Sequence, residues 1–244
     1  MTHLPIHDPG PTDPARADPE LARRAFTPFQ LGGLTLRNRI IKSATFEGMS
    51  PGGRASEALV EHHAALARGG VGMTTLAYAA VASAGRTFSE QLLVDEAQVE
   101  RLRPLTEAVH AHGAAASIQL AHCGGFTKHR APGDRGPMGP SAGFNAYGSL
   151  SGLPWTRAMS EADIADVVAT FADAAGLAKR AGFDAVELHL GHGYLLSQFL
   201  SPATNRRRDE YGGSLGGRSK FPIDVARRVR DALPANVAVL VKTN

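Results

Sequence analysis

The sequence predicts an α/β fold built on a parallel β-sheet. Short apolar runs recur along the chain, and stretches with helical periodicity separate them. The apolar runs are nearly continuous, as expected of strands that are covered on both faces. A composition of 43% hydrophobic and 20% charged residues is ordinary for a globular domain, and 244 residues are enough for one sizeable core.

Five strands and four helices are expected, with boundaries set by capping residues. Ser56 and Ser160 each suit a helix N-cap, Asp163 stands at the third position after Ser160, and Gly182 ends that helix. The predicted strands cover residues 39–44, 71–77, 114–121, 184–189 and 237–242, and the predicted helices cover residues 56–68, 96–112, 160–181 and 218–233.

This alternation fits either a doubly wound sheet or a barrel. A doubly wound nucleotide-binding sheet would carry a glycine-rich loop after its first strand. The residues found there, Ser43-Ala44-Thr45-Phe46, form no such loop.

Two segments fall outside the regular pattern. Residues 1–25 are rich in Pro, Asp, Ala and Arg and have no signal-peptide core, so we expect a disordered tail. Residues 122–159 are rich in Gly and Pro and follow the end of a predicted strand. A connection of this length is usually functional. We therefore expect a lid on the substrate side, with a simple insertion as the alternative.

The composition also narrows the class of protein. A single cysteine, Cys123, excludes a disulfide within the chain and an all-cysteine metal cluster, and it fits a reducing cytoplasm. A net charge of +3 is too diffuse to predict nucleic-acid binding, and Arg206–Arg208 indicates a solvated or salt-bridged loop. No apolar run reaches the ~18 residues that span a bilayer. We expect a cytoplasmic protein with no nucleic-acid or membrane partner.

The chemically richest segment is Glu187-Leu188-His189-Leu190-Gly191-His192-Gly193-Tyr194. It begins as a strand and ends in a glycine-flanked turn, so its polar groups lie at the carboxyl end of a strand, where α/β folds bind ligands. Two imidazoles can hold a polarised oxygen, and a phenol can give up a proton. This combination suits the reduction of an activated double bond. The alternatives are two histidines bound to local carbonyls, or a zinc site completed by His122 or Cys123.

Three further groups of residues accompany this segment, in a constant order between Phe26 and Lys242. They are Phe29, Leu31, Gly33, Leu34, Leu36, Asn38, Arg39 and Ile40; then Gln119, Leu120, His122 and Gly124; then Gln198-Phe199-Leu200-Ser201-Pro202, Asn205, Arg207, Asp209 and Tyr211-Gly212-Gly213-Ser214. Together with the histidine segment, they resemble the Old Yellow Enzyme family of NADH:flavin oxidoreductases. The resemblance implies an FMN-binding TIM (β/α)8 barrel that reduces enones, nitroalkenes or quinones with NAD(P)H as the reductant.

The resemblance also implies roles for single residues. His189 and His192 take the family's His-x-x-His/Asn positions, which bind the substrate's carbonyl or nitro oxygen, and Tyr194 protonates the α-carbon. Gln119 would address the O2/N3 edge of the flavin and Lys242 its N1 and O2. The alternatives are a capped strand-end amide and a surface lysine.

Further flavin contacts are implied for Ser43, Ala44, Thr45 and Phe46 and for the backbone of Tyr78. Several of these positions depart from the family's usual residues. Ala44 stands where proline is common, Phe46 where threonine or cysteine is common, Tyr78 where alanine is frequent and Lys242 where arginine is usual. The resemblance implies no metal.

A TIM barrel has eight strands, and the sequence up to Asn244 supplies five. We therefore expect residues 26–244 to be the N-terminal part of a barrel, an incomplete fold with two unpaired edges. Such a half-barrel predicts a homo-oligomer or a complementing C-terminal segment. It also leaves open an alternative function, a non-catalytic half-barrel that cannot hold FMN without a C-terminal partner.

Overall fold

The computed structural model describes residues 18–131, 133 and 135–243. Its main sheet has five parallel strands, and their order across the sheet is their order along the chain. These strands are β3 (Ile41–Lys42), β4 (Met73–Ala80), β5 (Ala115–Ala121), β9 (Ala185–Leu190) and β10 (Ala238–Thr243). The predicted strands are confirmed, although β3 is shorter than residues 39–44.

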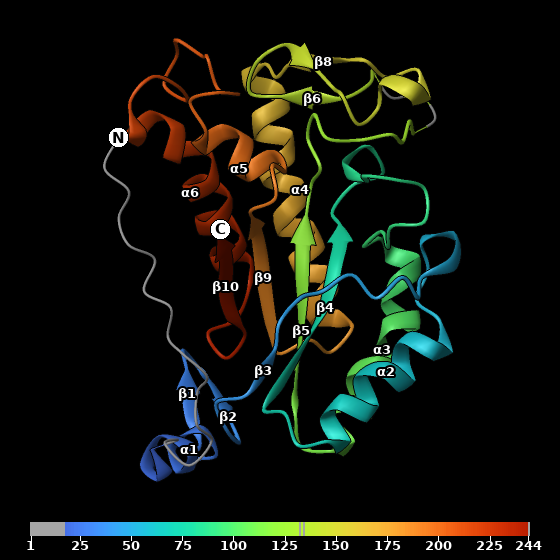
Figure 1. Ribbon diagram of the computed structural model, residues 1–244, viewed down its shortest axis with the longest axis vertical. Coiled ribbons are helices and arrows are strands. Elements are labelled where there is room, and N and C mark those ends of the chain that lie inside the picture. The colour runs from blue at the N-terminus through green and yellow to red at the C-terminus, as the bar shows by residue number, and fades with distance from the viewer. Residues whose placement is uncertain (1–17, 132, 134, 244) are drawn as a thin grey trace.

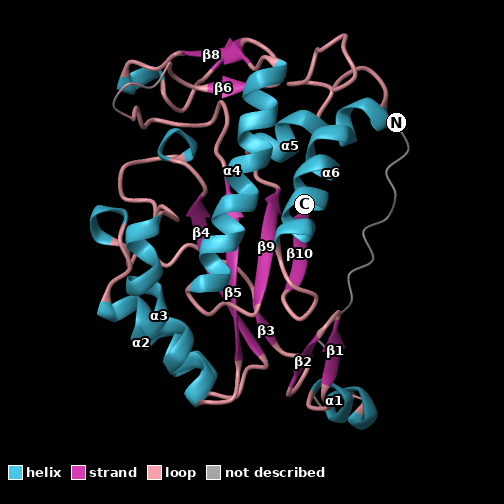
Figure 2. Ribbon diagram, turned by 180° about the vertical axis from the view of Figure 1, so that it is seen from behind, coloured by secondary structure: helices cyan, strands magenta, loops and turns pink. Residues whose placement is uncertain are grey.

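Four helices cover one face of this sheet, and the other face lies open toward the viewer of Figure 1 (Figures 1 and 2). They are α2 (Glu57–Arg68), α3 (Glu96–Ala111), α4 (Glu161–Arg180) and α6 (Leu215–Ala232). A doubly wound sheet carries helices on both faces, whereas a barrel carries them only outside. Sequential strands with helices on one face are therefore five adjacent strands of a (β/α)8 barrel, as the resemblance implied.

The strands separate an apolar outer face from a mixed inner face. Val186 and Leu188 of β9 pack with Ile118 of β5 in the main core beneath the helices. The alternate residues of β9, such as Glu187 and His189, point the other way, because successive side chains of a strand alternate between its faces. The inner face thus becomes polar toward the carboxyl ends of the strands.

A hairpin that the sequence reading missed covers the amino ends of the strands. It joins β1 (Phe29–Leu31) and β2 (Leu34–Leu36) in antiparallel register. Leu36, 1% exposed, packs with the first residues of four strands, which are Met73, Ala115, Ala185 and Ala238. Gly33 permits this close approach, since a Cβ there would lie 2.2 Å from the Ala235 oxygen. This end of the barrel is therefore filled by side chains.

The expected tail at residues 1–25 needs correction. Residues 1–17 lie outside the described residues, but a short helix, α1 (Pro19–Ala25), follows them. The Asp18 side chain accepts a hydrogen bond from the Glu20 amide at 2.9 Å, and Pro19 occupies the first turn. Both are helix-start signals that the low apolar content of the segment had outweighed.

Residues 122–159 form a small subdomain over the carboxyl ends of the strands (Figure 1). It contains β6 (Met138–Gly139), β7 (Gly143–Phe144) and β8 (Trp155–Ala158), which pair in the order β6-β8-β7. The short helix α5 (Leu195–Leu200) lies below it. Three 3-10 turns complete the regular structure, at Pro51–Gly53, Ser83–Gly85 and Ser149–Ser151. In the described part of the chain, no helix has the length and apolarity to cross a membrane.

Asp163 fastens this subdomain to α4. Its carboxylate accepts from the Ser160 amide at 2.8 Å while Ser160 Oγ accepts from the Asp163 amide at 3.1 Å, which confirms the predicted capping box. The same carboxylate accepts two bonds from Arg157, at 2.7 and 2.9 Å, and one from Arg135 at 3.0 Å. The hydrogen bonds from Arg157, together with those from Ser160, outweigh the cost of burial and hold the pKa of Asp163 well below its usual range.

We expect Asp163→Asn to lower the free energy of unfolding by about 1–3 kcal/mol, because it removes a helix cap and charge-assisted bonds. Denaturant titration at pH 7 measures this loss. Since the folded-state pKa of Asp163 is depressed, its contribution is present above the unfolded pKa of about 3.9 and is lost as the pH falls toward the folded value. The gap between the two proteins should therefore narrow below about pH 4. Asp166→Asn, an exposed change on the same helix, is the control; equal losses in both variants would contradict the prediction.

Candidate active site

The structure brings the three predicted catalytic side chains together at the carboxyl end of β9. His189 Nε2 and His192 Nδ1 are 3.0 Å apart and share a hydrogen bond. The Tyr194 ring stands perpendicular to the His189 ring, with 5.0 Å between centroids. His192 has φ 56°, a left-handed conformation that is uncommon outside glycine. This local turn lets two histidines three residues apart face each other.

His189 lies in a buried, electropositive setting. Burial lowers its pKa to about 4, and the neighbouring His192 and Lys242 act in the same direction. The imidazole is therefore neutral at pH 7. Its Nδ1 is buried and has no hydrogen-bond partner in the described part of the chain. This atom argues against the alternative in which local carbonyls satisfy both rings.

Tyr78 contributes its side chain to the cluster, which the sequence reading did not foresee. Its ring lies 5.5 Å from the Tyr194 ring and 6.3 Å from the His189 ring. Burial raises the pKa of Tyr78, and a hydrogen bond with Tyr194 raises it further, so this phenol stays protonated. The Tyr78 carbonyl accepts from Gln91 Nε2 at 3.2 Å. The backbone oxygen predicted to face the flavin is therefore engaged elsewhere in this structure.

Further aromatic rings surround the cluster. Phe46, half-exposed, contacts the Tyr78 ring at 5.7 Å and the Phe88 ring at 5.4 Å. Phe126 lies 5.9 Å from the Tyr194 ring. Phe88 and Phe126 come from loops and carry no motif, so only their spatial position marks them.

The polar residues of the inner face lie beside this cluster. Gln119 and Glu187 are register neighbours, and Gln119 Nε2 donates to Glu187 Oε1 at 2.7 Å. Burial raises the pKa of Glu187. Lys242 is the register neighbour of His189, and its Nζ donates to the Ala44 carbonyl at 3.0 Å. That bond links the ends of β10 and β3, the two edges of the sheet.

These residues fit the flavin that the resemblance implies. Thr75 Oγ1 and Ser117 Oγ are buried and, like His189 Nδ1, lack hydrogen-bond partners among the described residues. Buried polar groups without partners are rare in folded proteins, and ligands often supply the missing bonds. Together with the Gln119 amide and the Lys242 cation, they offer both donors and acceptors to a planar heterocycle.

The remaining predicted flavin contacts are less informative. Thr45 Oγ1 donates to the Ser43 carbonyl at 3.4 Å, a local bond that leaves their role a prediction. The zinc alternative finds no support, since no group of three His, Cys, Asp or Glu side chains in the described ranges could hold a metal ion. Cys123 Sγ instead lies 3.1 Å from the Arg86 carbonyl.

Comparison with known proteins gives consistent relatives. The chain is 46% identical over 226 residues to a 4,4'-dithiodibutanoate disulfide reductase of Rhodococcus erythropolis, covering 90% of this chain and 53% of the relative. It is 39% identical over 221 residues to an NADPH dehydrogenase of Listeria welshimeri, covering 89% of this chain and 63% of the relative. The chain thus spans about half to two thirds of the length of these relatives.

Solved structures agree in fold. The Old Yellow Enzyme of a Pichia species superposes with a TM-score of 0.83 at 26% identity, over 90% of this chain and 59% of that one. Morphinone reductase gives 0.80 at 29% identity, over 90% and 63%. The model of the NADH:flavin oxidoreductase / NADH oxidase family matches residues 24–243. The chain therefore belongs to the NADH:flavin oxidoreductase / NADH oxidase family, which includes the Old Yellow Enzymes.

Proposed function

We propose that this protein is an FMN-dependent oxidoreductase that uses NAD(P)H to reduce electron-poor C=C bonds in enones, nitroalkenes or quinones. The observation that carries the proposal is the cluster of His189, His192 and Tyr194 beside the polar inner face of the barrel. The names of two relatives, a disulfide reductase and an NADPH dehydrogenase, are consistent with reductive chemistry.

The residues that would hold FMN line the carboxyl ends of four strands. Gln119 would pair with the polar edge of the ring, and Lys242 would place a cation beside it, releasing Ala44. Backbone groups of residues 43–46 and 78 would complete the site. When bound, the flavin supplies the hydride. A cation at Lys242 would stabilise its anionic reduced form, with less orientation than the planar fork of arginine.

The chain's own side chains would prepare the substrate. His189, neutral at pH 7, and His192 would donate hydrogen bonds to the substrate oxygen and withdraw electrons from the double bond. Tyr194 would deliver a proton to the α-carbon. Tyr78, hydrogen-bonded to Tyr194, would keep that phenol oriented. The aromatic rings at Phe46 and Phe126 would exclude water from the reacting carbon.

The alternative function, a half-barrel that retains FMN only with a C-terminal partner, rests on a separate observation. β3 and β10 are the edges of the sheet within the described residues, and Val241 on β10 is 49% exposed. In related barrels the phosphate commonly binds the loops after strands seven and eight. Residues 1–244 reach the fifth strand.

We therefore expect a polypeptide of residues 1–244 to bind FMN weakly and to self-associate through its open edges. Flavin fluorescence quenching gives the affinity and gel filtration the size. Adding a second chain that carries the remaining strands of a relative should tighten binding. A monomer that holds one FMN tightly would instead favour an autonomous enzyme.

The second prediction concerns the two histidines. His189→Ala or His192→Ala should weaken binding of a phenol ligand at least about tenfold, since each removes a hydrogen bond to a polarised oxygen. Calorimetry on the FMN-loaded protein measures this. His62→Ala, on α2 and outside the cluster, is the control. Unchanged phenol affinity in both site variants would refute the assignment.

The third prediction separates the two half-reactions. Tyr194→Phe should slow alkene reduction by about 10²–10⁴-fold, because only that step needs the phenolic proton. Flavin reduction by NAD(P)H should stay near the unmodified rate, and quinone reduction should change little. Stopped-flow absorbance follows each half-reaction. Equal slowing of both would indicate that Tyr194 is structural.

A further inference from the structure

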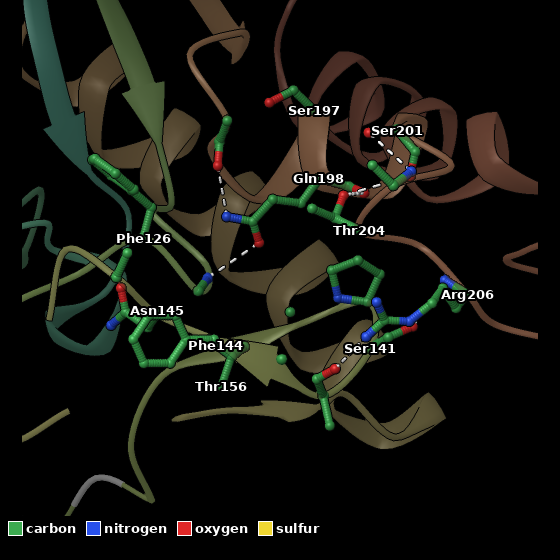
Figure 3. Close-up of a pocket in the computed structure, with 18 of the residues that line it drawn as sticks. Phe126, Ser141, Phe144, Asn145, Thr156, Ser197, Gln198, Ser201, Thr204 and Arg206 are labelled. Atoms are coloured by element: carbon green, nitrogen blue, oxygen red, sulfur yellow. Dashed lines mark hydrogen bonds between the residues drawn. The ribbon is translucent and has the colours of Figure 1, made fainter. Parts of the chain in front are cut away.

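A second pocket, of about 460 Å³, opens between the 122–159 subdomain and the segment around α5 (Figure 3). None of the three catalytic side chains lines it. Its wall is largely apolar or aromatic, with Phe126, Phe144 and Tyr147 on the subdomain side. Figure 3 shows Phe126 and Arg206 on opposite sides of this space.

One end of the pocket adjoins the catalytic cluster. Gly193, which lines the pocket, stands between His192 and Tyr194 in the chain. The Phe126 ring contacts Tyr194 at 5.9 Å and stacks on Tyr147 at 4.5 Å. A molecule that presents its reacting double bond to Tyr194 can therefore extend past Phe126 into the pocket.

The other end carries a cation. Arg206 donates through its amide to Ser141 Oγ at 2.9 Å and through one guanidinium nitrogen to the Ala142 carbonyl at 2.7 Å. Within residues 18–131, 133 and 135–243, no ion pair joins it to a carboxylate. Its neighbour Arg207 is different, because it pairs with Asp209 and donates to the Pro140 carbonyl.

The polar side chain in the middle of the wall is already satisfied. Gln198 donates to the carbonyls of Cys123, at 3.1 Å, and Gly193, at 2.6 Å, and accepts from the Gly125 amide at 3.1 Å. The pocket therefore offers an apolar path that ends at one positive charge. Arginine binds carboxylates through paired hydrogen bonds.

We propose that this pocket is a specificity site for the distal part of the substrate, and that it selects molecules with an apolar or aromatic body ending in a carboxylate bound by Arg206. The inference rests on the proposed function, since the same molecule must present its double bond to Tyr194. It adds a substrate class that the catalytic cluster alone does not define.

The test uses three enones that share one reacting group: benzylideneacetone, its para-carboxylate and its para-carboxamide. On the FMN-loaded protein, we expect the carboxylate to have a KM about tenfold lower than the carboxamide, the size of one partly exposed charge-assisted bond. Arg206→Gln keeps a donor for Ala142 but removes the charge, and should abolish this ratio. Arg208→Gln, an equal charge change at an arginine that does not line the pocket, should preserve it.

The outcomes separate the two proposals. Reduction of benzylideneacetone with no preference for the carboxylate, or a preference that survives Arg206→Gln, overturns the pocket assignment and leaves the proposed function standing. A protein that binds FMN but reduces none of the three enones overturns both. A general loss of turnover for all three substrates in Arg206→Gln, with an unchanged ratio, would show that Arg206 only supports the subdomain.

Discussion

Period-two alternation along five parallel strands is the constraint on which the rest of the structure depends. One set of residues, such as Ile118, Val186 and Leu188, is buried beneath the helices. The other set changes character along each strand, from Ala185 against the N-terminal hairpin to His189 at the carboxyl end. Because parallel strands end at one edge, the polar residues of neighbouring strands meet there without any long-range signal in the sequence.

Hydrogen bonds to loop segments then hold the upper layer over that edge. Asp163 ties β8 and residue 135 to the first turn of α4, and Arg207 ties the segment after α5 to the same subdomain through Pro140. Gln198 closes the arrangement from below by bonding the backbone around Cys123 and Gly125. The subdomain is thus positioned by charged and amide side chains, and its aromatic residues remain available to line cavities.

The sequence predicted those features that have local causes. Apolar runs and caps located all five strands and four helices, and the spacing of His189, His192 and Tyr194 located the site. The choice of a barrel came from the resemblance. Contacts across long separations were out of reach. Nothing near Phe29–Leu36 indicates that this hairpin covers four strand ends, and Tyr78, Phe88 and Phe126 meet the site only through folding. The helix at Pro19–Ala25 was missed because its composition resembles that of unstructured segments.

The left-handed backbone of His192 also bears on how this site can change during evolution. At φ 56°, side chains branched at Cβ are strongly disfavoured, and asparagine is among the few residues besides glycine that tolerate the conformation. Asparagine also keeps an amide donor near the position of the imidazole nitrogen. The family's alternation between histidine and asparagine at this position is then a consequence of main-chain geometry as much as of chemistry. Drift at residue 192 is confined to a narrow path, while the helix-covered face of the barrel can vary more freely in size and shape.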